Sequence, residues 1–285
     1  MRISTEIGTA SRVVGDQKAV ELCARAGFDA WDFSMFTVFH FDWSAWKATL
    51  TDHPLAGPGY VRYARELRRI GEENGIFCNQ SHAPFPSTAP GIRSFLKRAI
   101  ESTAEAGGRI CVIHPDNNRS AEENAEMYWD LLPFAKEHGV KIATENMWNW
   151  DHLQDHSVPA ACSTSDDFCR HIDVVNDPYL VACLDIGHAE MKGSGSGAVN
   201  MIHALGPRLQ ALHIHDNDLW HDHHQIPFTG QIDFPAVVRA LKEIGYSGDF
   251  TMEADYLRHC PDGDVLALLK KLASAARRLT EMFED

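Results

Sequence analysis

Carboxylate and imidazole side chains recur at the ends of short apolar runs in this 285-residue sequence, and these residue types can bind metal ions or move protons. Two Glu, one Asp and one His among them form a hard, mixed oxygen and nitrogen ligand set that suits Mn²⁺ or Zn²⁺, and also Co²⁺ or Mg²⁺. Charged groups that converge without an ion would repel one another or remain unpaired. We therefore predict that one divalent metal is bound by four residues that lie far apart in the chain: Glu145 in ATEN, Asp185 in CLDIGH, His215 in LHIHD and Glu253 in TMEA.

These residues need a scaffold that brings distant strand ends together. Short β-rich runs such as ICVIH and VKIAT alternate with longer segments of helical period, and glycines such as Gly27, Gly75 and Gly139 close the helices. Continuous apolar strands are typical of a parallel sheet covered by helices. The sequence thus predicts an α/β protein, a single-domain (β/α)8 TIM barrel over residues 1–285, with its chemistry at the carboxyl ends of the strands. The predicted strands are Ile3–Ile7, Ala30–Ser34, Ile76–Ser81, Ile110–His114, Lys141–Glu145, Val181–Asp185, Ala211–His215 and Phe250–Ala254.

Composition narrows the classes of function. The formal charge is −14, from 40 acidic and 26 basic residues, and such a surface disfavours extended contact with nucleic acid. None of the seven cysteines forms a C-x-x-C pair, which argues against a disulfide framework and a cysteine zinc site. No apolar stretch approaches the roughly 20 residues of a transmembrane helix, and the first residues lack the apolar core of a signal peptide. We expect a cytoplasmic protein without a membrane partner.

With these residues in place, the whole chain resembles the xylose isomerase-like TIM-barrel superfamily, which includes sugar (phosphate) isomerases and epimerases and the endonuclease IV type of abasic-site nuclease. The resemblance is carried by ATEN, by D-x-G-H at Asp185–His188, by H-x-H-D at His213–Asp216 and by the run DHHQIPFTGQIDF. That run departs from the usual family pattern at Phe228 and Thr229. The resemblance implies a metal held by the same Glu, Asp, His and second Glu named above.

The isomerase and epimerase branch implies a metal-dependent reaction on a sugar or sugar phosphate, in which a proton is transferred at a carbon next to a carbonyl through a metal-stabilised enediolate. Glu145 and Glu253 would act as base and acid, and Trp148 is a candidate to stack on a sugar face. Ketose 3-epimerases carry an Arg six residues after the metal-binding His, where this chain has His221. The other expected substrate contacts are His82, His114, His188, Asp222 and His224.

The nuclease branch stays open, because its three-zinc ligand types are all matched by the residues above. The flanking sequence differs, however: CLDIGHAEM replaces the nuclease's D-T-C-H form, and HDNDLW replaces N-D-S-K. A metal-dependent dehydratase or lyase of a polyhydroxylated acid and a non-catalytic barrel are further alternatives. We expect a small carbohydrate substrate and no nucleic-acid partner. The sequence shows no obvious Arg/Lys clamp for a phosphate, which favours an unphosphorylated sugar. The sequence leaves a homo-oligomer open.

Two segments of the expected mouth stand out. The aromatic segment 35–46 follows the second predicted strand and is expected either to wall the pocket or to cover an apolar rim. The long segment 147–163 follows Glu145 and is expected to form a lid.

Overall fold

Eight parallel strands form one sheet in the computed structural model, which describes residues 1–285. Their order is β11-β10-β7-β6-β5-β2-β1-β12. The sheet closes between its two end strands: Ile214 pairs with Met252, Ile214 N–H donates to the Thr251 carbonyl at 2.9 Å, and Glu253 N–H donates to the Ile214 carbonyl at 3.0 Å. The strands are β1 (Ile3–Glu6), β2 (Ala30–Ser34), β5 (Phe77–His82), β6 (Ile110–Val112), β7 (Lys141–Glu145), β10 (Leu180–Asp185), β11 (Leu209–His213) and β12 (Phe250–Met252).

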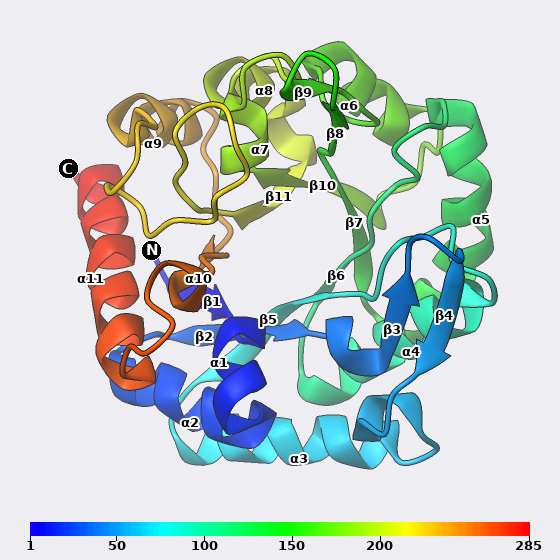
Figure 1. Ribbon diagram of the computed structural model, residues 1–285, viewed down its shortest axis with the longest axis vertical. Coiled ribbons are helices and arrows are strands. Elements are labelled where there is room, and N and C mark those ends of the chain that lie inside the picture. Colours follow the sequence, from blue (N-terminus) through cyan, green and yellow to red (C-terminus); the bar gives the residue numbers. More distant parts are fainter.

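The predicted single-domain (β/α)8 barrel is confirmed, since the helices form a ring around the sheet (Figure 1). Local signals set their ends, as in α5, where Ser120 and Glu123 form a capping box and Gly139 ends the helix at φ 66°. The helices are α1 (Gly8–Val14), α2 (Asp16–Ala26), α3 (Tyr60–Glu73), α4 (Ile92–Ala106), α5 (Ala121–His138), α6 (Ser165–Asp173), α7 (Ile186–Glu190), α8 (Ala198–Leu205), α9 (Phe234–Glu243), α10 (Tyr256–His259) and α11 (Val265–Glu284), with short 3-10 turns η1 (Phe36–Val38), η2 (Pro54–Ala56) and η3 (Gly206–Arg208).

Three strands end about two residues earlier than predicted, at Val112, His213 and Met252. Beyond these points the backbone keeps only single bridges, such as Ile214 to Met252, because the chain turns away from the ladder toward the barrel mouth. His114, His215 and Glu253 therefore stand just above the sheet rather than in it.

Two antiparallel hairpins rise at the mouth and were not predicted as strands. They are β3 (Phe39–Asp42) with β4 (Lys47–Leu50), in the aromatic segment, and β8 (Trp148–Asp151) with β9 (His156–Pro159), in the expected lid. Their turns are built alike. Asp42 and Asp151 each accept two backbone N–H bonds two and three residues on, and Trp46 and Asp155 then adopt left-handed φ of 50° and 53°. Figure 1 shows both hairpins beside the open centre of the ring.

The main hydrophobic core lies between the sheet and the helices. Outward-facing strand residues such as Ile142, Leu184 and Leu212 belong to one cluster of 71 buried residues. Because strand side chains alternate, their neighbours Ala143, Cys183 and Ala211 point inward and form a separate small cluster inside the barrel. No helix combines the length and the apolar character needed to cross a membrane.

Candidate active site

The residues that follow β7 and β10 hold each other in place. Glu145 is the last residue of β7 and is fully buried. Its neighbour Asn146 clamps the end of β10: Asn146 Nδ2 donates to the Asp185 carbonyl at 2.9 Å, and Asp185 N–H donates to Asn146 Oδ1 at 2.8 Å. This paired contact fixes the two strand ends relative to one another, so Glu145 and Asp185 have defined directions.

The D-x-G-H segment has a local structural logic. Asp185 caps α7 by accepting a bond from His188 N–H at 2.7 Å, which turns the chain sharply after β10. Gly187 is needed because a Cβ there would lie 1.9 Å from Cε1 of His215. The missing side chain lets the His215 ring lie directly against this turn, with Nε2 3.1 Å from Asp185 Oδ1.

One group of donor atoms gathers at the β5–β7 side of the mouth. His82 Nε2 and His114 Nε2 are 2.6 Å apart, and His114 Nε2 is 3.2 Å from Glu145 Oε2. The His82 ring is oriented from its other side, where Nδ1 lies 3.0 Å from Glu253 Oε1. Two imidazole nitrogens and a carboxylate oxygen thus point to one place.

A second group gathers at the β10–β11 side. Donor atoms of His188, His215, Asp222 and His224 all lie within 4.8 Å of one another. Asp222 Oδ2 is 3.1 Å from His224 Nε2 and 3.5 Å from His188 Nε2, while the rings of His215 and His224 are stacked at 3.9 Å. The ring of His224 is held by its Nδ1, which lies 2.7 Å from the Glu253 carbonyl.

The two glutamates of the site have opposite electrostatic environments. Burial opposes ionisation of Glu145, but the nearby His213 and His114 outweigh it and hold its pKa well below the usual value. Burial raises the pKa of Glu253 well above its usual value, and the charge of Glu145 adds to this effect against the opposing pull of His213. One carboxyl group therefore favours the ionised form and the other the protonated form.

Asp185 and His188 stabilise each other's charge. Burial raises the pKa of Asp185, but His188 and His215 reverse this and lower it to about 2. For His188, burial lowers the pKa, and Asp185 and Asp222 overcome this and raise it to about 10. Such strongly shifted pKa values inside a cleft are typical of functional sites.

These residues fit a divalent cation. Asp185 Oδ2, His215 Nε2 and Asp222 Oδ1 are buried and make no hydrogen bond, although buried polar atoms nearly always find a partner. Carboxylate oxygens and imidazole nitrogens are ligands of Mn²⁺ and Zn²⁺. Glu145 belongs to the first of the two donor groups described above, and His215 belongs to the second. Asp185 contacts the second group, with Oδ1 3.1 Å from His215 Nε2. Glu253 reaches both groups, with Oε1 3.0 Å from His82 Nδ1 and Oε2 4.0 Å from His224 Nδ1.

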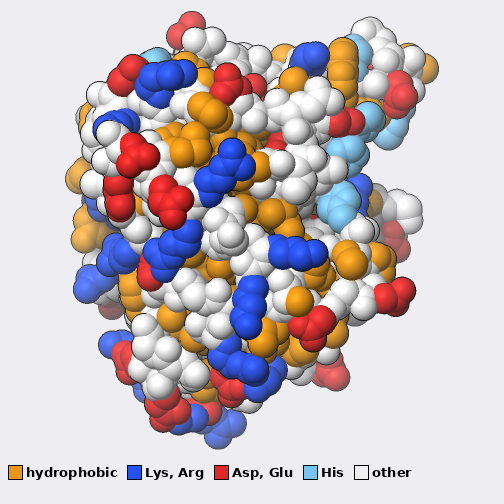
Figure 2. All heavy atoms as spheres, turned by 90° about the vertical axis from the view of Figure 1, so that its left-hand side faces the viewer, with side chains coloured by type: hydrophobic (Ala, Val, Ile, Leu, Met, Phe, Trp, Pro, Cys, Tyr) orange, Lys and Arg blue, Asp and Glu red, His pale blue; other side chains and the backbone are white.

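The donor groups form the floor of a pocket of about 340 Å³, and aromatic side chains form its walls. Every residue predicted to bind metal or substrate lies in it or directly beneath it, because Asp185 and His215 are fully buried under the lining. Trp148, at the start of β8, lines the pocket with its ring 6.3 Å from that of His188. The other walls come from Phe36, Trp43, Phe85, Asn117 and Met147. Figure 2 shows histidine side chains gathered along one edge of the molecule, whereas basic and acidic side chains are interspersed over the face toward the viewer.

Sequence reasoning missed the buried support beneath this pocket. His213 is fully buried, with Nδ1 3.1 Å from Glu145 Oε1 and Nε2 3.2 Å from Asp32 Oδ2. Gln80 Nε2 donates to the same Asp32 oxygen at 2.9 Å. His213 is the last residue of β11, two residues before His215, so strand alternation could have placed it on the inner face.

Comparison with known proteins gives one family and several relatives. The model of the family described as "Xylose isomerase-like TIM barrel" matches residues 20–278. An uncharacterized protein of Methanocaldococcus jannaschii is 26% identical over 79% of this chain and 79% of its own length. The L-ribulose 3-epimerase of Methylomonas sp. is 22% identical over 84% of this chain and 78% of its own. The crystal structure of a D-tagatose 3-epimerase-like protein superposes with a TM-score of 0.72 and 22% identity, over 100% of this chain and 97% of that one.

Proposed function

Because the chain belongs to the xylose isomerase-like TIM-barrel family, we propose that it is a metal-dependent sugar isomerase or epimerase. The observation that carries the proposal is the placement of two buried carboxyl groups, Glu145 and Glu253, in one aromatic-walled pocket that also holds four histidines and Asp222. The L-ribulose 3-epimerase relative supports a ketose as the substrate class.

The residues of this chain suit proton transfer next to a carbonyl. A bound divalent cation would act as a Lewis acid on the substrate oxygens. Glu145, Asp185, His215 and Glu253 are the residues proposed to hold it. Glu145 removes a proton from the carbon beside the carbonyl, and Glu253 returns one to the enediolate. In an isomerase, Glu253 would deliver its proton to the former carbonyl carbon. In an epimerase, it would deliver the proton to the carbon that lost one, but on the opposite face.

The surrounding residues position the sugar and limit water. His188 and Asp222 present a charged pair to the pocket, 3.5 Å apart, that can bind a substrate hydroxyl. The indole of Trp148 offers a flat apolar surface to the C–H face of a sugar ring. The pocket contains no Lys or Arg, which favours an unphosphorylated substrate.

Turnover of a ketose panel in deuterated water tests this function. We expect product that carries solvent deuterium at one carbon, activity lost with a chelator and restored by Mn²⁺ or Zn²⁺, and turnover at least ~100-fold lower in Glu253→Gln. Product without deuterium would exclude the proton-transfer route. Chelator-resistant turnover, or wild-type activity in Glu253→Gln, would remove the proposed metal or acid role.

A second candidate is a nuclease with a multinuclear zinc site. The observation that favours it is the presence of two separate donor groups, one around His82 and His114 and one around Asp222 and His224. Elemental analysis combined with an abasic-site duplex assay decides between the two functions. Three zinc ions per chain with strand cleavage would support the nuclease, and one ion per chain with ketose turnover supports the epimerase or isomerase.

A further inference from the structure

A larger cavity opens directly beside the catalytic pocket. It measures about 560 Å³ and continues from that pocket through five shared lining residues: Trp43, Phe85, His114, Asn117 and Met147. Its remaining walls come from the β3–β4 turn, the loop after β5, the loop after β6 and the start of β8. We call this cavity the annex. Since the catalytic pocket measures about 340 Å³, a single sugar unit held at the glutamates leaves most of the annex free.

One wall of the annex is aromatic and exposed. Trp43 and Trp46 stand in the turn of the β3–β4 hairpin with 60% and 50% of their surface exposed. Both pack edge-on against Phe41, with ring centroids 5.0 and 5.2 Å apart, so the indoles are held in place from behind. Large apolar side chains exposed at a cavity indicate a binding surface.

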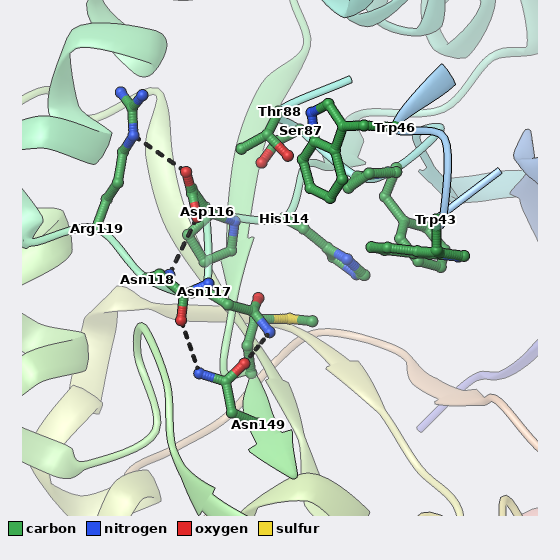
Figure 3. A pocket seen from close by; sticks show the side chains of 14 residues that line it. Trp43, Trp46, Ser87, Thr88, His114, Asp116, Asn117, Asn118, Arg119 and Asn149 are labelled. Atoms are coloured by element: carbon green, nitrogen blue, oxygen red, sulfur yellow. Dashed lines mark hydrogen bonds and ion pairs between the residues drawn. The ribbon is translucent and has the colours of Figure 1, made fainter. Parts of the chain in front are cut away.

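The facing wall is made of neutral amides with free hydrogen-bonding atoms. Asn149 Nδ2 donates to Asn118 Oδ1 at 3.0 Å, and Asn117 Nδ2 donates to Asn149 Oδ1 at 3.1 Å. This network orients the three amides and leaves Asn117 Oδ1 and Asn118 Nδ2 without a partner. Figure 3 shows the tryptophans on one side of the cavity and these asparagines on the other, with His114 between them.

The annex carries little net charge. Its Arg119 forms an ion pair with Asp116, with Nε 3.0 Å from Oδ2. The other polar lining groups are amides, the hydroxyls of Ser87 and Thr88, and the imidazole of His114. An anionic ligand such as a phosphate would have to compete with Asp116 for that guanidinium. A ligand with an apolar flat face and many neutral hydroxyls matches both walls, and a sugar ring has these two properties.

We propose that the annex binds a second sugar residue, so that the substrate is a glycosidically linked saccharide whose ketose unit reacts in its open-chain form at Glu145 and Glu253. The reaction in this inference rests on the proposed function, whereas the binding of a second sugar in the annex does not. The glycosidic bond passes His114 and stays intact. The ring in the annex stacks on the tryptophans and hydrogen-bonds to the asparagines.

The test compares fructose with fructose-ended disaccharides, namely maltulose, palatinose and turanose, as ligands of the metal-loaded full-length protein. Dissociation constants come from calorimetry and kcat/KM from turnover. We expect at least one disaccharide to bind at least tenfold more tightly than fructose. Trp46→Ala and Asn118→Ala, which alter only the annex, should each remove most of that preference and change fructose binding less than twofold. Trp129→Ala, which removes an equally exposed indole from α5, is the matched control and should change neither.

The outcomes separate the two proposals. A disaccharide preference that depends on Trp46 and Asn118, found without turnover of any ketose, supports the annex and overturns the proposed reaction. Turnover of fructose without any disaccharide preference overturns the annex and leaves the reaction in place. Equal affinities in wild type and both annex variants overturn the annex even if the variants fold normally by circular dichroism.

Discussion

The two halves of the barrel interior differ in composition, although both support the same mouth. Strands β6, β7, β10 and β11 contribute a cluster of small apolar side chains to the interior, and strands β12, β1, β2 and β5 contribute hydrogen-bonded polar ones. The apolar half comprises Val112, Ala143, Val181, Cys183 and Ala211. The polar half comprises Ser4, Asp32, Asn79, Gln80 and Thr251.

The polar half forms two short networks. Ser4 Oγ donates to Asn79 Oδ1 at 2.7 Å, and Asn79 Nδ2 donates to Thr251 Oγ1 at 3.1 Å. Above them, Asp32 contacts Gln80 and also His213, which reaches across the interior from β11. The apolar half packs well with any apolar side chains of suitable volume. In the polar half, each side chain must keep its hydrogen-bond partner, because an unpaired buried polar group is costly.

His213 connects this difference to chemistry. Its Nε2 contacts Asp32 and its Nδ1 contacts Glu145, so the polar half orients the proposed base through one imidazole ring. Such buried partners commonly fix the direction of a functional carboxylate or imidazole. We infer that changes in the polar half affect activity, while changes in the apolar half affect stability.

Replacing His213 with Ala should give the largest effect. The substitution leaves the buried carboxylates of Asp32 and Glu145 without their shared partner, which costs about 3–5 kcal/mol of unfolding free energy. We also expect kcat to fall at least ~100-fold because the proposed base loses its orientation. Urea unfolding and steady-state kinetics measure the two effects. Near-normal kcat in a folded His213→Ala protein would show that the polar half does not orient Glu145.

Asp32→Asn should separate orientation from stability. Asparagine has the same shape, so the folded state keeps its packing, but the charge that faces His213 is gone. We expect kcat to fall roughly 10–100-fold. KM should be nearly unchanged, because Asp32 lies beneath the pocket and does not line it. A raised KM with unchanged kcat would place the role of Asp32 in substrate binding instead.

Val181→Ala tests the apolar half. Val181 is 2% exposed, and its truncation should cost roughly 2 kcal/mol of unfolding free energy through lost burial and a small cavity. We expect kcat/KM to stay within about twofold of wild type, because no hydrogen bond is changed. If kcat fell as far as in Asp32→Asn, the division of the interior into two roles would be wrong.

Much of the barrel was predictable from the sequence. Each of the eight predicted strands exists, because continuous apolar runs and helix-ending glycines are local signals. The positions of Glu145, Asp185 and Glu253 at the mouth followed from the barrel alone, since closure brings the carboxyl ends of parallel strands together.

The missing parts depend on contacts between residues far apart in the chain. Asp32 and His213 are 181 positions apart, and neither segment contains a pattern that pairs them. The two hairpins were missed for a different reason. Their turns depend on an Asp side chain and one left-handed residue, Trp46 or Asp155. Trp is rare in that conformation, and Asp, although it adopts it more readily, is not a specific signal for a hairpin turn. The choice between one cation and several depends on distances that strand ends do not specify.

The smallest predicted effect concerns His171, a buried histidine in the surrounding helices. Unlike His213, it does not contact the candidate active site, so its replacement should affect stability alone. His171 belongs to α6 and faces α5, with Nε2 3.2 Å from Asn124 Nδ2 and Nδ1 3.4 Å from Asp167 Oδ2. Burial lowers its pKa, but Asp167 and Cys162 together outweigh this effect and raise the pKa to about 10. Since the folded pKa exceeds that of the unfolded chain, near 6.5, the stabilisation is complete below pH 6.5 and is lost as the pH approaches 10. We expect His171→Gln to unfold about 1 kcal/mol more easily than wild type at pH 6, a gap that closes toward pH 10, with kcat unchanged at every pH. Thermal melts and kinetics at pH 6, 8 and 10 measure this, and a gap that widens with pH would mean that His171 is neutral in the folded protein.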